Sequence, residues 1–130
     1  MLISINNTLG KPDFEKLLAS TINSLNLESS RAGERYLKLL GHKLENEVYD
    51  VMCSNAENTP FEGTIELISG QKFPDIIANN YFGVEVKSTK QNHWTTTGNS
   101  VFESTRAENI KRIYMLFGKI SPPVQFKCRP

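Results

Sequence analysis

Several features that would assign this chain to a functional class are missing from its sequence. The net charge is only +1, with 15 Lys and Arg residues against 14 Asp and Glu residues. Overall charge therefore gives no argument for binding to nucleic acid or to an anionic surface. No run approaches the roughly 20 apolar residues of a membrane-spanning helix, and the N-terminus has no basic-then-apolar signal segment. We expect a cytoplasmic protein with no membrane contact.

Cysteine is also scarce, which limits the metal sites that the chain can form. Cys53 and Cys128 stand far apart and show no zinc-ligand spacing with His42 or His93. We expect two free thiols, with Cys53 buried at the end of a helix, and no zinc. A length of 130 residues gives room for one small domain, over 1–130, with a core of its own and for no second domain.

The stretch from Phe73 to Thr89 holds the most informative pattern. Two runs of β-branched and aromatic residues surround an Asn-Asn pair, which tolerates the left-handed backbone of a tight turn. This pattern predicts a strand, a turn near Asn80-Tyr81 and a second strand. Because side chains alternate along a strand, we expect Val84 and Val86 to point into a core.

Two acids and a lysine are expected on the other face of this hairpin. A turn at that position places Asp75 across from Lys87 and within reach of the face that carries Glu85. Mg²⁺ prefers oxygen ligands, and here Asp75 and Glu85 supply two carboxylates and the Val86 carbonyl a third oxygen. Lys87 can orient or deprotonate an attacking water and offset charge in a transition state. The alternative interpretation is an exposed strand face with a cross-strand ion pair, which adds little stability.

These residues and their spacing resemble the PD-(D/E)xK nuclease superfamily, which includes type II restriction endonucleases, Holliday-junction resolvases and a strand-nicking mismatch-repair endonuclease. Pro74-Asp75 matches the first half of the motif and Glu85-Val86-Lys87 the second. The resemblance implies an α/β (α+β) fold with a restriction-endonuclease-like core, a mixed β-sheet flanked by helices in the order αβββαβ. It also implies a metal-dependent endodeoxyribonuclease that uses Mg²⁺, with Mn²⁺ as a substitute.

The predicted elements follow that order. An N-terminal helix over 9–27 is expected to pack on a catalytic core over 30–120. Within the core we expect a long amphipathic helix from Ser30 to Cys53, which Ser29-Ser30 caps. A strand over 63–69 and the hairpin should follow this helix. After the hairpin we expect a loop over 90–100, a helix over 100–109 and a strand over 113–117. The end, 121–130, is expected to be extended and irregular, as in a truncated chain or a minimal form that dimerises.

The resemblance also points to a third acid. Relatives carry a glutamate on the first core helix, often in a pattern like Gly-x-x-Leu-Glu, and the residues from Gly41 to Glu45 are similar to it. Glu45 is therefore the candidate, with Glu34 and Glu47 as substitutes on the same helix. A glutamate on a helix flank is also an ordinary solvated residue, and this alternative stays open.

Because the whole chain is nearly neutral, any DNA-binding surface must be local. Basic side chains cluster in sequence around the second motif and the helix after it, where they can contact phosphates: Lys87, Lys90, His93, Arg106, Lys111 and Arg112. His93-Trp94 also offers a ring for base stacking or a packing anchor. We expect a type II restriction endonuclease that binds DNA as a homodimer. The alternatives are a repair nuclease or Holliday-junction resolvase, or a non-catalytic nucleic-acid-binding module of the same fold.

Overall fold

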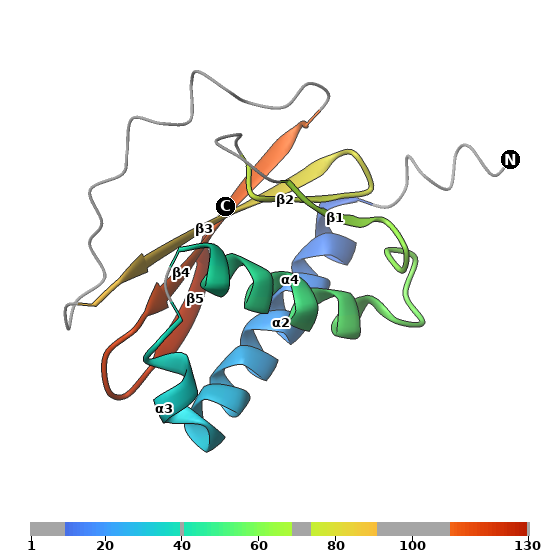
Figure 1. Cartoon of the computed structure of the whole chain (residues 1–130). Helices are drawn as coiled ribbons and strands as arrows, with labels where there is room; N and C mark the ends of the chain where they lie inside the picture. Colours follow the sequence, from blue (N-terminus) through green and yellow to red (C-terminus); the bar gives the residue numbers. More distant parts are fainter. Residues whose placement is uncertain (1–9, 40, 69–73, 91–109, 130) are drawn as a thin grey trace, which may run out of the picture.

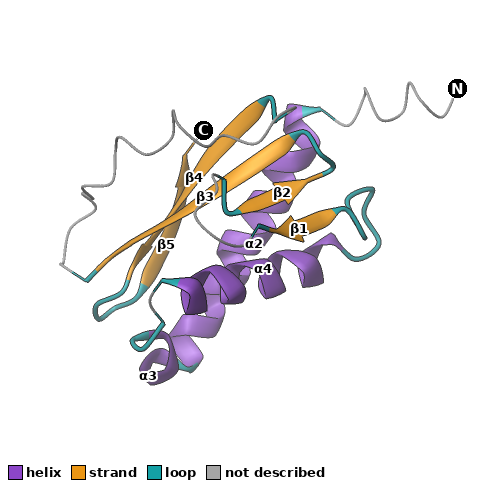
Figure 2. Cartoon of the chain, turned by 45° about the horizontal axis from the view of Figure 1, so that its top comes forward, coloured by secondary structure: helices purple, strands orange, loops and turns teal. Residues whose placement is uncertain are grey.

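The chain folds as an α+β structure in which helices pack on one face of a mixed sheet (Figures 1 and 2). The computed structural model describes residues 10–39, 41–68, 74–90 and 110–129. The helices are α2 (Lys11–Arg31), α3 (Gly33–Tyr36) and α4 (His42–Ala56), and the strands are β1 (Ile65–Leu67), β2 (Ile76–Ala78), β3 (Phe82–Thr89), β4 (Arg112–Lys119) and β5 (Gln125–Arg129). The mixed α/β class predicted from the sequence is confirmed.

The sheet has five strands in the order β1-β2-β3-β4-β5. The first three strands form an antiparallel meander, β3 and β4 are parallel, and β5 returns antiparallel to β4. A parallel pair needs a crossover connection, and here the chain between β3 and β4 supplies it. The loop and helix predicted over 90–109 fall in this connection, and beyond residue 90 they lie outside the described residues.

The β2–β3 hairpin confirms the predicted strand, turn and strand. Asn79 and Asn80 have φ of 55° and 52°, and the N–H of Tyr81 donates to the carbonyl of Ala78 at 3.1 Å. Two successive left-handed residues are typical of the turns that match the twist of a hairpin. The turn therefore centres on the Asn-Asn pair, one residue earlier than predicted.

This shift changes which residue faces Asp75. In the observed register Ile76 pairs with Val84 and Ala78 with Phe82. Extending that register by one residue places Asp75 across from Glu85. The prediction that Asp75 lies across from Lys87 is therefore wrong, because it depended on a turn at Asn80-Tyr81.

The core lies between the sheet and the two long helices. Val84 and Val86 point into it, as predicted, and are 1% and 8% exposed. From α2, the ring of Phe14 stacks on that of Phe82 with centroids 4.5 Å apart. From α4, the buried side chains recur every four residues and are Leu44, Val48, Met52 and Ala56. This buried stripe faces the core, so the opposite face of α4 is turned away from the sheet.

The single helix predicted from Ser30 to Cys53 is wrong. Ser29 and Ser30 lie inside α2, and their hydroxyls donate back to the carbonyls of Asn26 and Leu27 instead of capping a new helix. The chain then forms the short α3 and turns at Gly41, whose φ of 56° is one that glycine adopts readily. The helix that carries Glu45 begins only after this glycine, so the approach of Glu45 to the sheet is set by the turn.

The C-terminal segment is also more regular than predicted. Residues Gln125–Arg129 form β5 and pair with β4 over Met115–Lys119. Asn26 of α2 covers the outer edge of β5, where its side-chain oxygen accepts from the N–H of Phe126 at 2.8 Å and its amide donates to the carbonyl of Phe126 at 3.3 Å. The predicted strands over 63–69 and 113–117 are observed as β1 and β4. In the described part of the chain no helix is both long and apolar enough to span a membrane.

Candidate functional site

The two halves of the sequence motif meet where β2 begins. The backbone N–H of Val86 donates to a carboxylate oxygen of Asp75 at 2.9 Å. In an antiparallel strand the N–H and C=O of one residue point to the same side. The carbonyl of Val86 therefore also faces the Asp75 side of β3, and the carboxyls of Asp75 and Glu85 are close enough to interact.

Glu85 is the acid on which the site centres. Although it is a charged residue, Glu85 lies in the middle of β3 and is only 8% exposed. One carboxylate oxygen, Oε2, is 3.3 Å from the ammonium of Lys87. The other, Oε1, is buried and has no hydrogen-bond partner. A buried polar atom without a partner is costly, and such atoms in native proteins usually have an explanation, for example an ion. The exposed ion-paired strand face that was the alternative interpretation is not what the geometry shows.

The raised pKa values of the two acids, Asp75 and Glu85, also indicate a place for a cation. Burial is the largest cause that raises the pKa of Asp75, the backbone hydrogen bond from Val86 opposes it, and the charges of Glu85 and Glu45 and a side-chain hydrogen bond with Glu85 add to it, so that the pKa is about 7. Burial also raises the pKa of Glu85, and the charge of Lys87 partly offsets this. One ammonium thus does not compensate two buried carboxylates. A bound divalent cation would stabilise the charged forms of both.

Glu45 is a third acid whose charge acts on this site. It lies in the first turn of α4, and its charge raises the pKa of both Asp75 and Glu85. Its side chain is 20% exposed, and Oε1 lies 3.3 Å from Nδ1 of His42. His42 is a neighbour of the site that the sequence analysis assigned no role.

The two substitutes for Glu45 have other positions. Glu47 accepts hydrogen bonds from the guanidinium of Arg35 at 3.1 and 3.0 Å and from the hydroxyl of Tyr36. These bonds tie α3 to α4. Glu34 is exposed on α3. Of the three glutamates, Glu45 is therefore the best candidate for the site.

The donor set fits a hard cation better than a transition metal. Among the described residues, no three His, Cys, Asp or Glu side chains come together as a ready-made metal site. Two carboxylates and a backbone carbonyl are a set that suits Mg²⁺, which keeps several waters in its shell. The unpartnered Oε1 of Glu85 is an oxygen that such an ion would satisfy. Both cysteines are free thiols.

Gly83 holds the two motif halves together, a role that the sequence analysis missed. A Cβ on Gly83 would lie 2.5 Å from Cγ of Pro74 and 2.9 Å from Cδ1 of Ile113. The absence of a side chain thus lets the Pro74 ring pack directly on β3. Because Pro74 precedes Asp75, this contact helps to set the position of the acid. A glycine two residues before the Glu-x-Lys pattern is the only sequence signal for it.

The predicted phosphate contacts are only partly brought together. Lys90 follows the end of β3, whereas Lys111 and Arg112 lie where β4 begins and bond to the hairpin turn through the carbonyl of Tyr81. The strands are parallel and eight residues long, so the two sets are separated by roughly 26 Å of strand. His93 and Trp94, like Arg106, lie outside the described residues.

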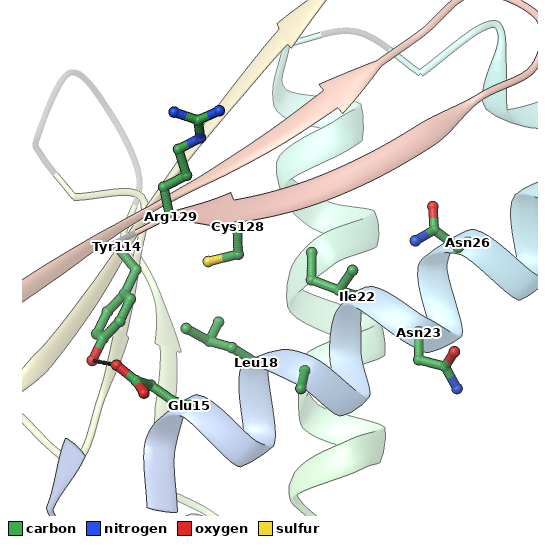
Figure 3. A pocket seen from close by; sticks show the side chains of 9 residues that line it. Glu15, Leu18, Ile22, Asn23, Asn26, Tyr114, Cys128 and Arg129 are labelled. Carbon is green, nitrogen blue, oxygen red and sulfur yellow. Dashed lines mark hydrogen bonds between the residues drawn. The ribbon is translucent and has the colours of Figure 1, made fainter. Parts of the chain in front are cut away.

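A groove of about 530 Å³ lies elsewhere, between α2 and the strands β4 and β5 (Figure 3). Leu18 and Cys128 point toward each other across it, and the hydroxyl of Tyr114 donates to Glu15 at 3.1 Å. None of the candidate ligands Asp75, Glu85 and Glu45 lines this groove. It is therefore separate from the acid pair.

Comparison with known proteins does not identify the site. The chain matches no protein-family model, and searches of curated proteins and of solved structures gave no match. What the arrangement can do follows from its own groups. Two buried carboxyls and a carbonyl can hold a hard cation, and an ammonium next to them can act on a phosphate or a water.

Proposed function

We propose that this protein is a Mg²⁺-dependent endodeoxyribonuclease that hydrolyses phosphodiester bonds of DNA. Asp75, Glu85 and the carbonyl of Val86 hold the metal, with Mn²⁺ as a substitute, and Glu45 assists. The observation that carries the proposal is the environment of Glu85. One of its oxygens contacts Lys87, the other is buried, and the carboxyl of Asp75, which bonds to the N–H of Val86, interacts with it.

The arrangement of the strands supports the same proposal. A helix, α4, precedes a three-stranded antiparallel meander, Asp75 lies just before its second strand and Glu85 on its third, and β4 follows parallel to β3. The resemblance to the PD-(D/E)xK superfamily implies this order of elements. Within that superfamily, we propose a type II restriction endonuclease that acts as a homodimer, since one active site per protomer and two protomers account for cleavage of both strands.

The bound ion and the side chains of the protein have different roles in the reaction. When bound, Mg²⁺ supplies positive charge that stabilises the transition state and favours ionisation of a water. Lys87 orients the attacking water and offsets the charge that develops on the phosphate oxygens. The water oxygen forms a bond to phosphorus, the bond from phosphorus to one sugar oxygen breaks, and the water proton passes to that leaving oxygen. The hydrogen bond from Val86 keeps Asp75 in place throughout.

Two other functions remain as alternatives. A repair nuclease or a Holliday-junction resolvase would use the same residues on a different DNA substrate. A non-catalytic nucleic-acid-binding module would keep the fold and lack the reaction. The buried acid pair favours the enzymes, because without a bound cation Asp75 and Glu85 keep their negative charges only at raised pKa values.

Cleavage of supercoiled plasmid and of phage DNA with Mg²⁺ tests the proposal. We expect activity that is lost in Asp75→Asn and in Lys87→Ala. The matched controls are Glu66→Gln, an exposed acid on the neighbouring strand β1, and Lys16→Ala, an exposed lysine on α2. Both controls should cleave like the unmodified protein.

The products separate the enzymes. Discrete fragments that require Asp75 and Lys87 would identify a sequence-specific nuclease. Nicking or smearing with the same requirement would favour a repair nuclease, and preference for a four-way junction would favour a resolvase. DNA binding without any Mg²⁺- or Mn²⁺-dependent cleavage would contradict the enzyme proposal and favour the non-catalytic module.

A further inference from the structure

We propose that Arg35 is a positioning residue, which holds α4 through Glu47 so that Glu45 keeps its place beside the acid pair. This inference rests on the proposed function, because it concerns the acid that assists the metal site. It extends the site to α3, a short helix that carries none of the motif residues and that the sequence did not predict as a separate element.

The first turn of α4 carries Glu45 but has few contacts of its own that fix its direction. Its N-cap is Gly41, which has no side chain to bond the free N–H groups of that turn. Ser, Thr, Asp and Asn usually supply such bonds. The carboxylate of Glu45 lies 3.3 Å from Nδ1 of His42, but His42 belongs to the same turn and its side chain is 82% exposed. This contact therefore does not attach the turn to the rest of the protein.

Glu45 and Glu47 lie on opposite sides of the buried row of α4. Leu44 and Val48 form the start of this row and pack in the core. With about 3.6 residues per turn, Glu45 lies about 80° to one side of these two residues and Glu47 about 80° to the other. Rotation of the helix about its buried row would move the two glutamates together, one toward the sheet and the other away from it. A contact that holds Glu47 therefore also fixes the position of Glu45.

Arg35 supplies that contact with both ends of its guanidinium. Nη1 and Nη2 donate to the two carboxylate oxygens of Glu47 at 3.1 and 3.0 Å. A two-point contact of this kind fixes direction as well as distance. The hydroxyl of Tyr36 donates to the same carboxylate, and the guanidinium carbon lies 4.7 Å from the centroid of the Tyr36 ring. Two neighbouring residues of α3 thus hold Glu47 from one side.

α3 is itself attached to the core, so it can serve as a base for this contact. Tyr36 is 0% exposed, and its ring meets that of Phe126 on β5 edge-on, with centroids 6.0 Å apart. Asn26 of α2 bonds to the backbone of Phe126. An isolated ion pair at a surface adds little. The pair of Arg35 and Glu47 differs, because a buried tyrosine connects it to β5 and α2.

The position of Glu45 matters for the metal because its charge reaches both acids of the pair. Burial is the main cause that raises the pKa of Asp75 and of Glu85, and the charge of Glu45 adds to it. Interactions between charges weaken with distance. The same negative charge that disfavours two ionised carboxylates favours a divalent cation beside them. Movement of Glu45 away from the pair should therefore weaken metal binding.

Metal titration in a double-mutant cycle tests this role of Arg35. Isothermal titration calorimetry with Mn²⁺, in the absence of DNA, measures the affinity directly. We expect Arg35→Met to weaken Mn²⁺ binding about tenfold, which is the lower end of the effect of residues that orient metal ligands. Arg35→Lys keeps the charge without the two-point contact and should have a smaller effect. In a Glu45→Gln background Arg35→Met should cause no further loss, because its effect passes through Glu45.

The control is Lys11→Met, which breaks an exposed ion pair with Glu15 on α2 and should leave the Mn²⁺ affinity unchanged. Urea unfolding of every variant separates positioning from stability. If Arg35→Met lowers only the midpoint of unfolding and the folded protein binds Mn²⁺ as before, the inference is overturned. Equal weakening of Mn²⁺ binding with and without Glu45 would overturn it too. Should Arg35→Met fail to fold, the same cycle with Arg35→Lys decides.

The two proposals can fail separately. If the unmodified protein binds Mn²⁺ and cleaves DNA while the Arg35 variants keep its metal affinity, the proposed function stands and only the positioning role is wrong. If the unmodified protein neither binds Mn²⁺ nor cleaves DNA, both proposals fail.

Discussion

Asp75 is bound to the strand that carries its partner acid, through the hydrogen bond of 2.9 Å from the backbone N–H of Val86. This bond connects the start of β2 to β3 one residue beyond Glu85. The two acids therefore keep their relative position through a backbone contact and do not rely on side-chain packing alone. A carboxylate positioned in this way is prepared for a ligand that it shares with Glu85.

Divalent metal should stabilise the protein in a manner that requires both acids. We expect Mg²⁺ or Mn²⁺ to raise the midpoint of thermal unfolding, because an ion that binds only the folded chain adds about 2.7 kcal/mol when present at 100 times its Kd. Asp75→Asn and Glu85→Gln should each abolish the increase. Differential scanning fluorimetry with and without EDTA measures it, with Glu66→Gln as the control. An increase that persists in both variants would place the metal elsewhere.

Gly83→Ala should damage the site and the fold together. The added methyl would lie 2.5 Å from Cγ of Pro74, and overpacking of a tight contact costs typically 1–3 kcal/mol. Displacement of Pro74 should move Asp75 away from Glu85 and weaken metal binding as well. Chemical denaturation and metal titration measure the two effects. Gly33→Ala is the matched control, because nothing lies within 4 Å of a Cβ at that position. A Gly83→Ala protein with unchanged metal affinity would show that Pro74 does not position the acid.

Glu47 should contribute stability that disappears in acid. The hydrogen bonds from Arg35 hold the pKa of Glu47 below its ordinary value. The folded chain therefore binds this proton less readily than the unfolded chain, and the contribution is complete at neutral pH. It is lost as the pH falls below the ordinary value of 4.5 and through the lowered pKa. Glu47→Ala should cost roughly 1–3 kcal/mol at pH 7, since it leaves the buried Tyr36 hydroxyl without its partner.

Urea denaturation at pH 7 and pH 3 checks this expectation. The difference between Glu47→Ala and the unmodified protein should shrink at the lower pH. Glu34→Ala, at an exposed position of α3, should show little difference at either pH. A penalty for Glu47→Ala that is the same at both values would mean that packing, and not the charge, is responsible.

Much of the hairpin could be predicted because its signals are local. The Asn-Asn pair marked the turn, and alternation placed Val84 and Val86 in the core. The error of one residue in the turn had a larger effect, since it exchanged Glu85 for Lys87 as the residue opposite Asp75. Periodicity alone does not fix the register, which depends on which residues take left-handed backbone conformations.

The helices and the last strand were harder to predict. Apolar spacing continues from Leu37 through Leu44, so the pattern did not reveal the turn at Gly41 between α3 and α4. The hydroxyls of Ser29 and Ser30 resembled a cap but bond back inside α2. The C-terminal segment was expected to be irregular, whereas β5 is defined by its long-range pairing with β4. Neither the burial of Glu85 nor its unpartnered oxygen has a sequence signal.

Asn26→Ala should loosen the outer edge of the sheet. The variant removes both hydrogen bonds to the backbone of Phe126 and leaves a partly buried N–H and C=O unsatisfied, at a cost of roughly 1–3 kcal/mol. An unpaired strand edge also promotes association between chains. Thermal unfolding and light scattering report the two effects. Asn23→Ala, one turn earlier on α2 and exposed, is the control and should behave like the unmodified protein.

The way in which Asp75 and Glu85 are joined has a consequence for folding. They are ten positions apart in the chain, and a turn of three residues, Asn79 to Tyr81, connects their strands. Closing so short a loop costs little entropy, whereas pairing of β3 with β4 and of Asn26 with Phe126 must wait for distant parts of the chain to meet. The acid pair can therefore assemble early, ahead of the pairing of β4 with β5. Metal present during refolding should accordingly act on the first steps of folding as well as on the finished protein.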